Sequence, residues 1–152
     1  MKKLFLLFFS IIFSISVFAS DNYKTIKEGE MKILITISNS SGVHKLTAIL
    51  ENNSSASAFY KLVENDSITV EMHDYGNFEK VGNLPRSLPR NDKQIKTKPG
   101  DIILYQGNQI TIYYDENSWN FTKLGKIVNI NQNELKKILG SGNVIAIFSV
   151  MM

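Results

Sequence analysis

The segment PGDIILYQGNQITIYY, residues 99–114, decides the fold because it holds two short apolar strands around a glycine turn. A two-residue turn at Gly107 and Asn108 is typical of a β-hairpin. Pairing across such a turn sets Tyr105 opposite Ile110, and the alternation of side chains then predicts that both point into the hydrophobic core. The sequence therefore predicts an antiparallel hairpin with one apolar face and one more polar face.

The same alternation elsewhere predicts a mainly β protein. Apolar residues at every second position predict further strands at residues 31–38, 43–50, 67–74, 118–124 and 143–150. The region between residues 75 and 98 contains several glycines and prolines and is predicted to be irregular. These elements indicate a small antiparallel barrel or sandwich.

Two helices are expected to cap this structure. The first follows Ser54 or Ser55, either of which suits an N-cap. The second begins at Asn131, whose spacing to Glu134 is that of a capping box, and ends at Gly140.

The amino terminus has the pattern of a bacterial export signal. Two lysines precede an apolar run that ends at Phe18, and small residues suit cleavage after Ala19. The run of about 15 residues is shorter than the roughly 20 that a membrane-spanning helix needs. We therefore expect a signal peptide at 1–19, a short tether at 20–30 and one domain at 31–152. The processed protein is expected to be periplasmic or extracellular, without a stable membrane anchor.

The composition excludes several classes of protein. The chain has no cysteine, so it contains no disulfide, thiol nucleophile or zinc–thiolate site. Without Lys2 and Lys3 the formal net charge falls from +3 to +1, and the remaining lysines are scattered, so we do not expect nucleic-acid binding. His44 and His73 stand alone, which predicts structural histidines, and neither a metal nor another cofactor is expected.

Four segments, taken in order, resemble the small bacterial cyclophilin-like domain proteins. They are DYGNFEKVGNLPRSLP (74–89), PGDIILYQGNQITIYY (99–114), NSWNFTKLGKI (117–127) and ELKKILGSGNVIAIFSV (134–150). The resemblance extends from residue 31 to the C-terminus. It implies a closed, mostly antiparallel cyclophilin-like barrel with two capping helices, and it leaves the function open, because one fold supports many sites.

True cyclophilins are peptidyl-prolyl isomerases whose site holds an arginine on a barrel strand. The only arginines here, Arg86 and Arg90, lie in the loop LPRSLPR, residues 84–90. Two arginines on a stiff loop suit a carboxylate or phosphate ligand, whereas a solvated turn between strands is the simpler interpretation. Glu79 and Lys80 are expected to form an ion pair that holds this loop to the barrel.

The aromatic residues offer a second candidate site. Trp119 alternates with Phe121 and could belong to the core, or it could lie at a barrel mouth beside Tyr75 and a hairpin tyrosine, where aromatic faces stack on a ligand. The candidate ligand-binding residues are Tyr75, Arg86, Tyr105, Gln106, Asn108, Tyr113 and Trp119.

These observations predict an exported, non-catalytic accessory domain that binds a small molecule or a peptide. The alternative is a peptidyl-prolyl isomerase that uses a loop arginine, because a guanidinium can stabilise a twisted amide.

Overall fold

The structure is a computed structural model that describes residues 29–140 and 142–151. The predicted signal peptide and residues 20–28 of the predicted tether lie outside this described part. Neither of the two helices described here has both the length and the apolar character needed to cross a membrane. The elements, in chain order, are β1 (Lys32–Asn39), β2 (Gly42–Leu50), α1 (Ser54–Asn65), β3 (Ile68–Tyr75), β4 (Glu79–Asn83), β5 (Lys93–Lys96), β6 (Asp101–Tyr105), β7 (Gln109–Tyr113), β8 (Ser118–Val128), α2 (Gln132–Leu139) and β9 (Val144–Val150).

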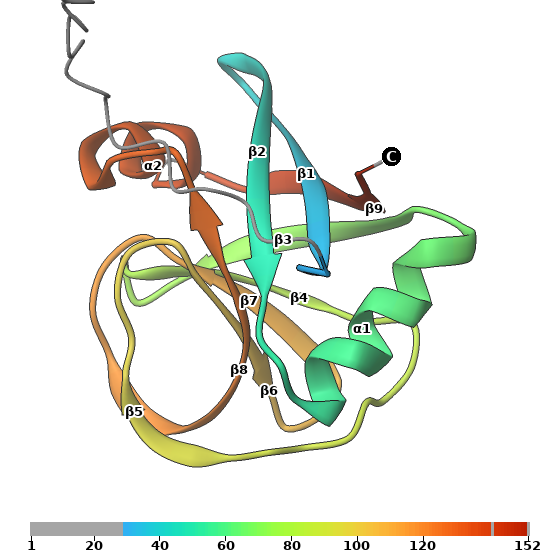
Figure 1. Ribbon diagram of the computed structural model, residues 1–152. Coiled ribbons are helices and arrows are strands. Elements are labelled where there is room, and N and C mark those ends of the chain that lie inside the picture. Colours follow the sequence, from blue (N-terminus) through green and yellow to red (C-terminus); the bar gives the residue numbers. More distant parts are fainter. Residues whose placement is uncertain (1–28, 141, 152) are drawn as a thin grey trace, which may run out of the picture.

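Eight of the strands close into an antiparallel barrel (Figure 1). Their order is β2-β1-β9-β3-β4-β7-β6-β8, and a further pairing of β2 with β8 closes the ring. The remaining strand, β5, pairs only with the first part of β8. This confirms the predicted mainly β, closed antiparallel barrel.

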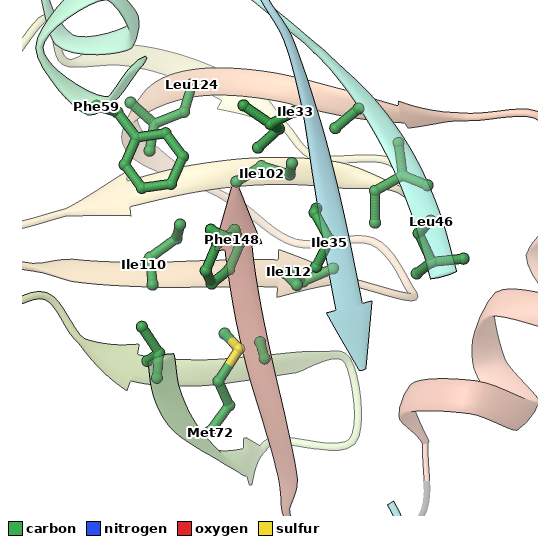
Figure 2. Close-up of a cluster of buried hydrophobic side chains, with 14 of the residues drawn as sticks. Ile33, Ile35, Leu46, Phe59, Met72, Ile102, Ile110, Ile112, Leu124 and Phe148 are labelled. Atoms are coloured by element: carbon green, nitrogen blue, oxygen red, sulfur yellow. The ribbon is translucent and has the colours of Figure 1, made fainter. Parts of the chain in front are cut away.

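The barrel interior is filled with aliphatic and aromatic side chains. On β1, Ile33, Ile35 and Ile37 point inward at every second position and are fully buried. Figure 2 shows Ile33, Ile35 and Phe148 of β9 within one cluster of buried side chains, which also includes Ile102 of β6 and Ile110 of β7. Because large apolar side chains occupy this space, a ligand site is to be sought on the outside of the barrel.

The two predicted helices are present. The helix α1 packs on β8 and β9, and Phe59 meets Phe148 edge to face at 5.6 Å between ring centroids. Its N-cap is Asn53, whose side chain accepts a hydrogen bond from the Ala56 amide, so the prediction of Ser54 or Ser55 was wrong by one or two residues. For α2 the predicted cap is confirmed, since Asn131 accepts from the Glu134 amide at 2.9 Å. That the helices cap the barrel ends stays a prediction.

The pairing of the central hairpin differs from the prediction by one residue. The structure pairs Tyr105 with Gln109 and Leu104 with Ile110. Gln106, with φ of 50°, and Gly107, with φ of 79°, both take the left-handed conformation, so the connection contains one residue more than predicted. A shift of one residue reverses the face of one strand relative to the other. The side chain of Tyr105 therefore points to the outer face and not into the core.

The region predicted to be irregular contains two strands, β4 and β5. The strand β4 lies between β3 and β7 and is part of the barrel wall. Its Gly82 is what lets β3 come close: a Cβ there would lie 2.4 Å from Cγ1 of Val70 and 2.5 Å from the carbonyl oxygen of Glu71. The glycine that suggested a loop is therefore a packing requirement of a strand.

Candidate functional site

A pocket lined by aromatic residues lies on the outer wall of the barrel, over β3, β4, β7, β6 and β8. Its volume is about 430 Å³, within the range of small-ligand sites. The lining residues are His73, Tyr75, Glu79, Val81, Tyr105, Gln109, Tyr113, Asn117, Trp119 and Phe121. Tyr105 and Tyr113 lie on the outer face of the hairpin, so this pocket lies on the outside of the barrel wall; that its residues bind a ligand stays a prediction.

Aromatic rings support one another along the pocket. Tyr113 stacks on Phe78, with centroids 6.0 Å apart and ring planes 9° apart, and meets Phe121 at 5.8 Å. Phe121 in turn meets Tyr105 edge to face at 6.2 Å, while Tyr75 meets Phe78 at 5.9 Å. Since Tyr113 and Phe121 are also buried, these rings form a rigid floor.

Two large aromatic side chains at the pocket are left open to solvent. Trp119 is 59% exposed and Tyr75 is 60% exposed. Trp119 lies near the start of β8 and is paired with Ile95 of β5. This first part of β8 pairs with β5, which is not one of the eight strands of the closed barrel. The interpretation of Trp119 as a core residue was therefore wrong, although Phe121, two residues later, is buried as that interpretation required.

One carboxyl group lies in the pocket. Glu79 is only 8% exposed and stands opposite Tyr113 on the paired strands β4 and β7. Its Oε2 atom is shielded from solvent and has no hydrogen-bond partner among the described residues. Burial raises the pKa of this carboxyl; a hydrogen bond with Tyr113 opposes the shift, and the negative charge of Asp74 adds to it.

The neighbouring lysine belongs to a different site. Lys80 is fully buried and points into the barrel, where its Nζ lies 2.9 Å from Oδ1 of Asp74 and 5.6 Å from the ring centre of Tyr114. Tyr114 also donates a hydrogen bond to Asp74. Burial acts to raise the pKa of Asp74, but these two donors and the lysine charge hold it below its usual 3.8. The predicted Glu79–Lys80 ion pair was wrong, because consecutive residues of a strand point to opposite faces.

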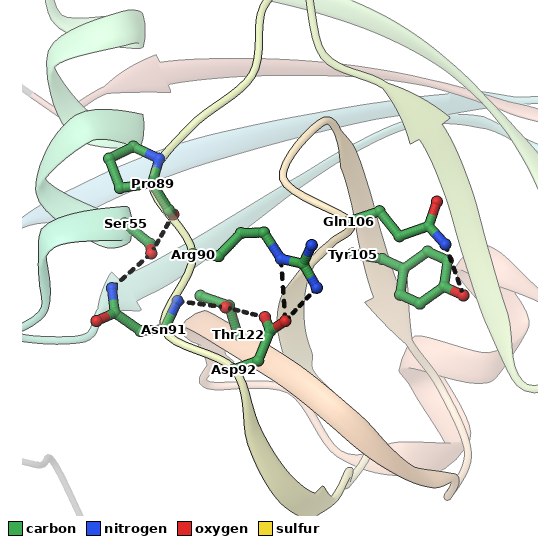
Figure 3. Close-up of polar contacts among 8 residues, drawn as sticks. All are labelled: Ser55, Pro89, Arg90, Asn91, Asp92, Tyr105, Gln106 and Thr122. Atoms are coloured by element: carbon green, nitrogen blue, oxygen red, sulfur yellow. Dashed lines mark hydrogen bonds and ion pairs between the residues drawn. The ribbon is translucent and has the colours of Figure 1, made fainter.

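The two arginines lie outside the aromatic pocket. Both are exposed, in the loop between β4 and β5. Figure 3 shows the Arg90 guanidinium turned toward Asp92, with which it forms an ion pair. That contact, followed by a hydrogen bond from Thr122, lowers the pKa of Asp92. Arg86 has an exposed side chain and does not line the pocket.

The proline-containing loop is anchored to the barrel by hydrogen bonds and two buried leucines. The amides of Leu84 and Leu88 donate to the carbonyl oxygens of Asn108 and Gly107, at 2.8 and 2.7 Å. On its other side, Asn91 donates to Ser55 at 2.8 Å, as Figure 3 shows. This loop is therefore more closely tied to the barrel than a solvated turn.

The candidate residues divide into two groups. Tyr75, Tyr105, Tyr113 and Trp119 line one pocket, whereas Arg86, Gln106 and Asn108 do not. Gln106 approaches the rim, where its amide donates to the Tyr105 hydroxyl at 3.2 Å (Figure 3).

Sequence reasoning missed six of the lining residues. The polar ones are His73, Glu79, Gln109 and Asn117, and the apolar ones are Val81 and Phe121. Recognising residues 79–83 as a strand would have placed Glu79 and Val81 on one face.

Throughout the described ranges, no group of three or more histidine or acidic side chains is arranged to hold a metal ion.

Comparison with known proteins agrees with the observed barrel. No curated protein matches the chain. The model of the cyclophilin-like family matches residues 39–149, which include all of the described strands except most of β1 and the last residue of β9. A closed antiparallel barrel with this order of elements, together with a match over most of the chain, shows that the protein belongs to the cyclophilin-like family.

Proposed function

We propose that the protein is an exported, non-catalytic accessory domain that binds a small molecule or a short peptide in the aromatic pocket. The observation that carries this proposal is the solvent exposure of Trp119 and Tyr75 beside a pocket of about 430 Å³. Exposed aromatic faces over a rigid floor supply contact area at little cost in side-chain entropy.

A binding role is favoured over isomerisation because of where the arginines lie. An isomerase of this kind needs a donor held at hydrogen-bond distance from the prolyl amide. Arg90 is engaged by Asp92 and Arg86 lies outside the pocket. Within residues 29–140 and 142–151, no arginine or lysine lines the pocket, which offers polar and aromatic contacts in place of a fixed cation.

Binding can be tested with the intrinsic fluorescence of Trp119, the only tryptophan in the chain. A thermal-shift screen of the secreted protein should find ligands that also change the Trp119 emission. The variant Tyr75→Ala should weaken the binding of those ligands, whereas Val43→Ala, which removes an exposed apolar side chain outside the pocket, should not. Ligands that bind Tyr75→Ala and the unchanged protein equally would argue against this pocket.

Export is supported by the basic start and apolar run of the first 19 residues. Mass spectrometry of the protein from culture medium or periplasm should give a chain that begins at Ser20. Recovery of the chain with Met1 in the membrane fraction would contradict export with cleavage.

A further inference from the structure

The aromatic pocket combines open ring faces with a carboxylate that has no cationic partner in the described part of the chain. We propose that it binds an alkylammonium group, either of a small amine or of a lysine side chain in a peptide. This inference rests on the proposed binding function and names the chemistry of its ligand.

The carboxylate gives the pocket its charge preference. Glu79 forms no ion pair within the described part of the chain, and the adjacent Lys80 is committed to Asp74 on the other side of the wall. A buried carboxylate without a counter-ion is costly, and in a site shielded from water its attraction for a cation is stronger than at the surface. Because no described residue of the lining is a lysine or an arginine, a ligand can supply the missing positive charge.

The aromatic rings suit the same ligand. The face of a tryptophan or tyrosine ring carries negative potential, and several rings around one cation make a recognised site for alkylammonium groups. Here Trp119 and Tyr75 are exposed at the pocket, and Tyr105, Tyr113 and Phe121 complete the wall. An amine with methyl or methylene groups would bury its apolar part against these rings and leave its charge near Glu79.

The pH dependence of binding distinguishes this ligand from a neutral one. The groups that face Glu79 are His73 and Tyr75 from β3 and Tyr113 from β7, and Asp74 adds a negative charge from behind. A cationic ligand binds the ionised form of Glu79 more strongly than the protonated form, so the affinity of the pocket for that ligand should rise as pH increases from 5 to 8. A neutral ligand that accepts a hydrogen bond from the protonated carboxyl would show the opposite trend.

His73 lines the same pocket as Glu79. The variant His73→Asn removes its imidazole, so that Glu79 is the remaining histidine or acidic side chain among the described lining residues. With this variant, the affinity for a cation should still rise with pH if Glu79 is responsible.

The experiment is a Trp119 fluorescence titration of the secreted protein with paired probes. One pair is choline and its uncharged carbon isostere, in which a tert-butyl group replaces the trimethylammonium group. The other pair is the blocked amino-acid amides of lysine and norleucine. We expect each charged probe to bind at least about tenfold more tightly than its neutral partner. If choline binds more tightly than the blocked lysine amide, the ligand is a small amine; if the lysine amide binds more tightly, the ligand is a lysine side chain of a peptide.

Glu79→Gln should remove that charge selectivity, whereas Glu64→Gln, a change at an exposed residue of α1, should alter neither the selectivity nor the affinity for the neutral probes. Equal binding of charged and neutral probes, or selectivity that survives Glu79→Gln, would overturn the inference and leave the binding function intact. Failure of all four probes would also overturn it, and the thermal-shift screen would then decide separately whether the pocket binds other ligands.

Discussion

The substitution Glu79→Gln should stabilise the unliganded protein at neutral pH. Glu79 is nearly buried, and its Oε2 has no hydrogen-bond partner among the described residues. Glutamine has almost the same shape and removes the charge. The folded state would therefore no longer hold a desolvated carboxylate, and the free energy of unfolding should rise.

The size of the effect follows from the cost of an unsatisfied buried group. Such a group costs about 1–3 kcal/mol, and more when it is charged. Glutamine still brings two polar atoms into the same site, so we expect a net gain of about 1 kcal/mol. For one domain of this size that gain raises the melting temperature by roughly 3–5 °C.

The gain should depend on pH with a defined sign. The pKa of Glu79 is raised above its usual 4.5, so between that value and the folded-state pKa the folded protein holds more protons than the unfolded chain. Stability is therefore lost as pH rises through this window. Below pH 4.5 both side chains are neutral and the two proteins should melt alike; above the folded-state pKa the advantage of glutamine should reach a plateau.

Thermal and urea unfolding of the unchanged protein, Glu79→Gln and the control Glu64→Gln between pH 4 and pH 8 would test this. The unchanged protein and Glu79→Gln share every other acidic group, so the difference between their unfolding free energies isolates Glu79. A difference that is constant across this range would show that packing, and not charge, is responsible. Destabilisation by Glu79→Gln at every pH would refute the reasoning.

Three further predictions concern the wall and the loop. Lys80→Ala should lower the free energy of unfolding by about 3 kcal/mol or more in urea melts, because it leaves Asp74 without its cationic partner, whereas Lys80→Met, which keeps the apolar stem, should cost less. Gly125→Ala should cost about 3 kcal/mol in the same assay, since a Cβ there would lie 2.5 Å from the carbonyl oxygen of Ile49. Proline isomerisation of a test peptide should proceed at its uncatalysed rate, with a relaxation time of roughly tens of seconds or longer, and Arg86→Ala should leave that rate unchanged; catalysis that Arg86→Ala abolishes would restore the isomerase alternative.

The barrel could be predicted from the sequence because its strongest signals are local. Alternating apolar residues on β1 and β7 fix which faces of those strands turn inward, and the cap of α2 depends only on Asn131 and Glu134. The exact pairing of the hairpin is different, because it depends on Gln106. A glutamine with positive φ is uncommon, and nothing in its chemistry distinguishes it from a residue that stays in the strand.

The candidate site was harder to predict because it requires non-local contacts. Gly82 suggested a loop, yet it allows β3 and β4 to approach, and without β4 there was no reason to place Glu79 beside Tyr113. The tyrosines and Trp119 were identified by residue type alone. Their shared pocket follows from the hairpin register and from the early part of β8, which pairs with β5 outside the closed barrel.

Two departures from the rules of stable folding occur in this one pocket. Glu79 is a buried carboxyl, one oxygen of which has no hydrogen-bond partner among the described residues, and Trp119 and Tyr75 are large aromatic side chains exposed to solvent. Each feature by itself is unfavourable or neutral for the stability of the folded domain. The neighbouring buried charge is treated differently, because Lys80 forms an ion pair with Asp74, which also accepts a hydrogen bond from Tyr114. Features that cost stability and lie together are expected at binding sites, where an occupant compensates for them. A cation over these rings would both cover the aromatic faces and neutralise the carboxylate, which is why we infer one ligand chemistry from two independent observations.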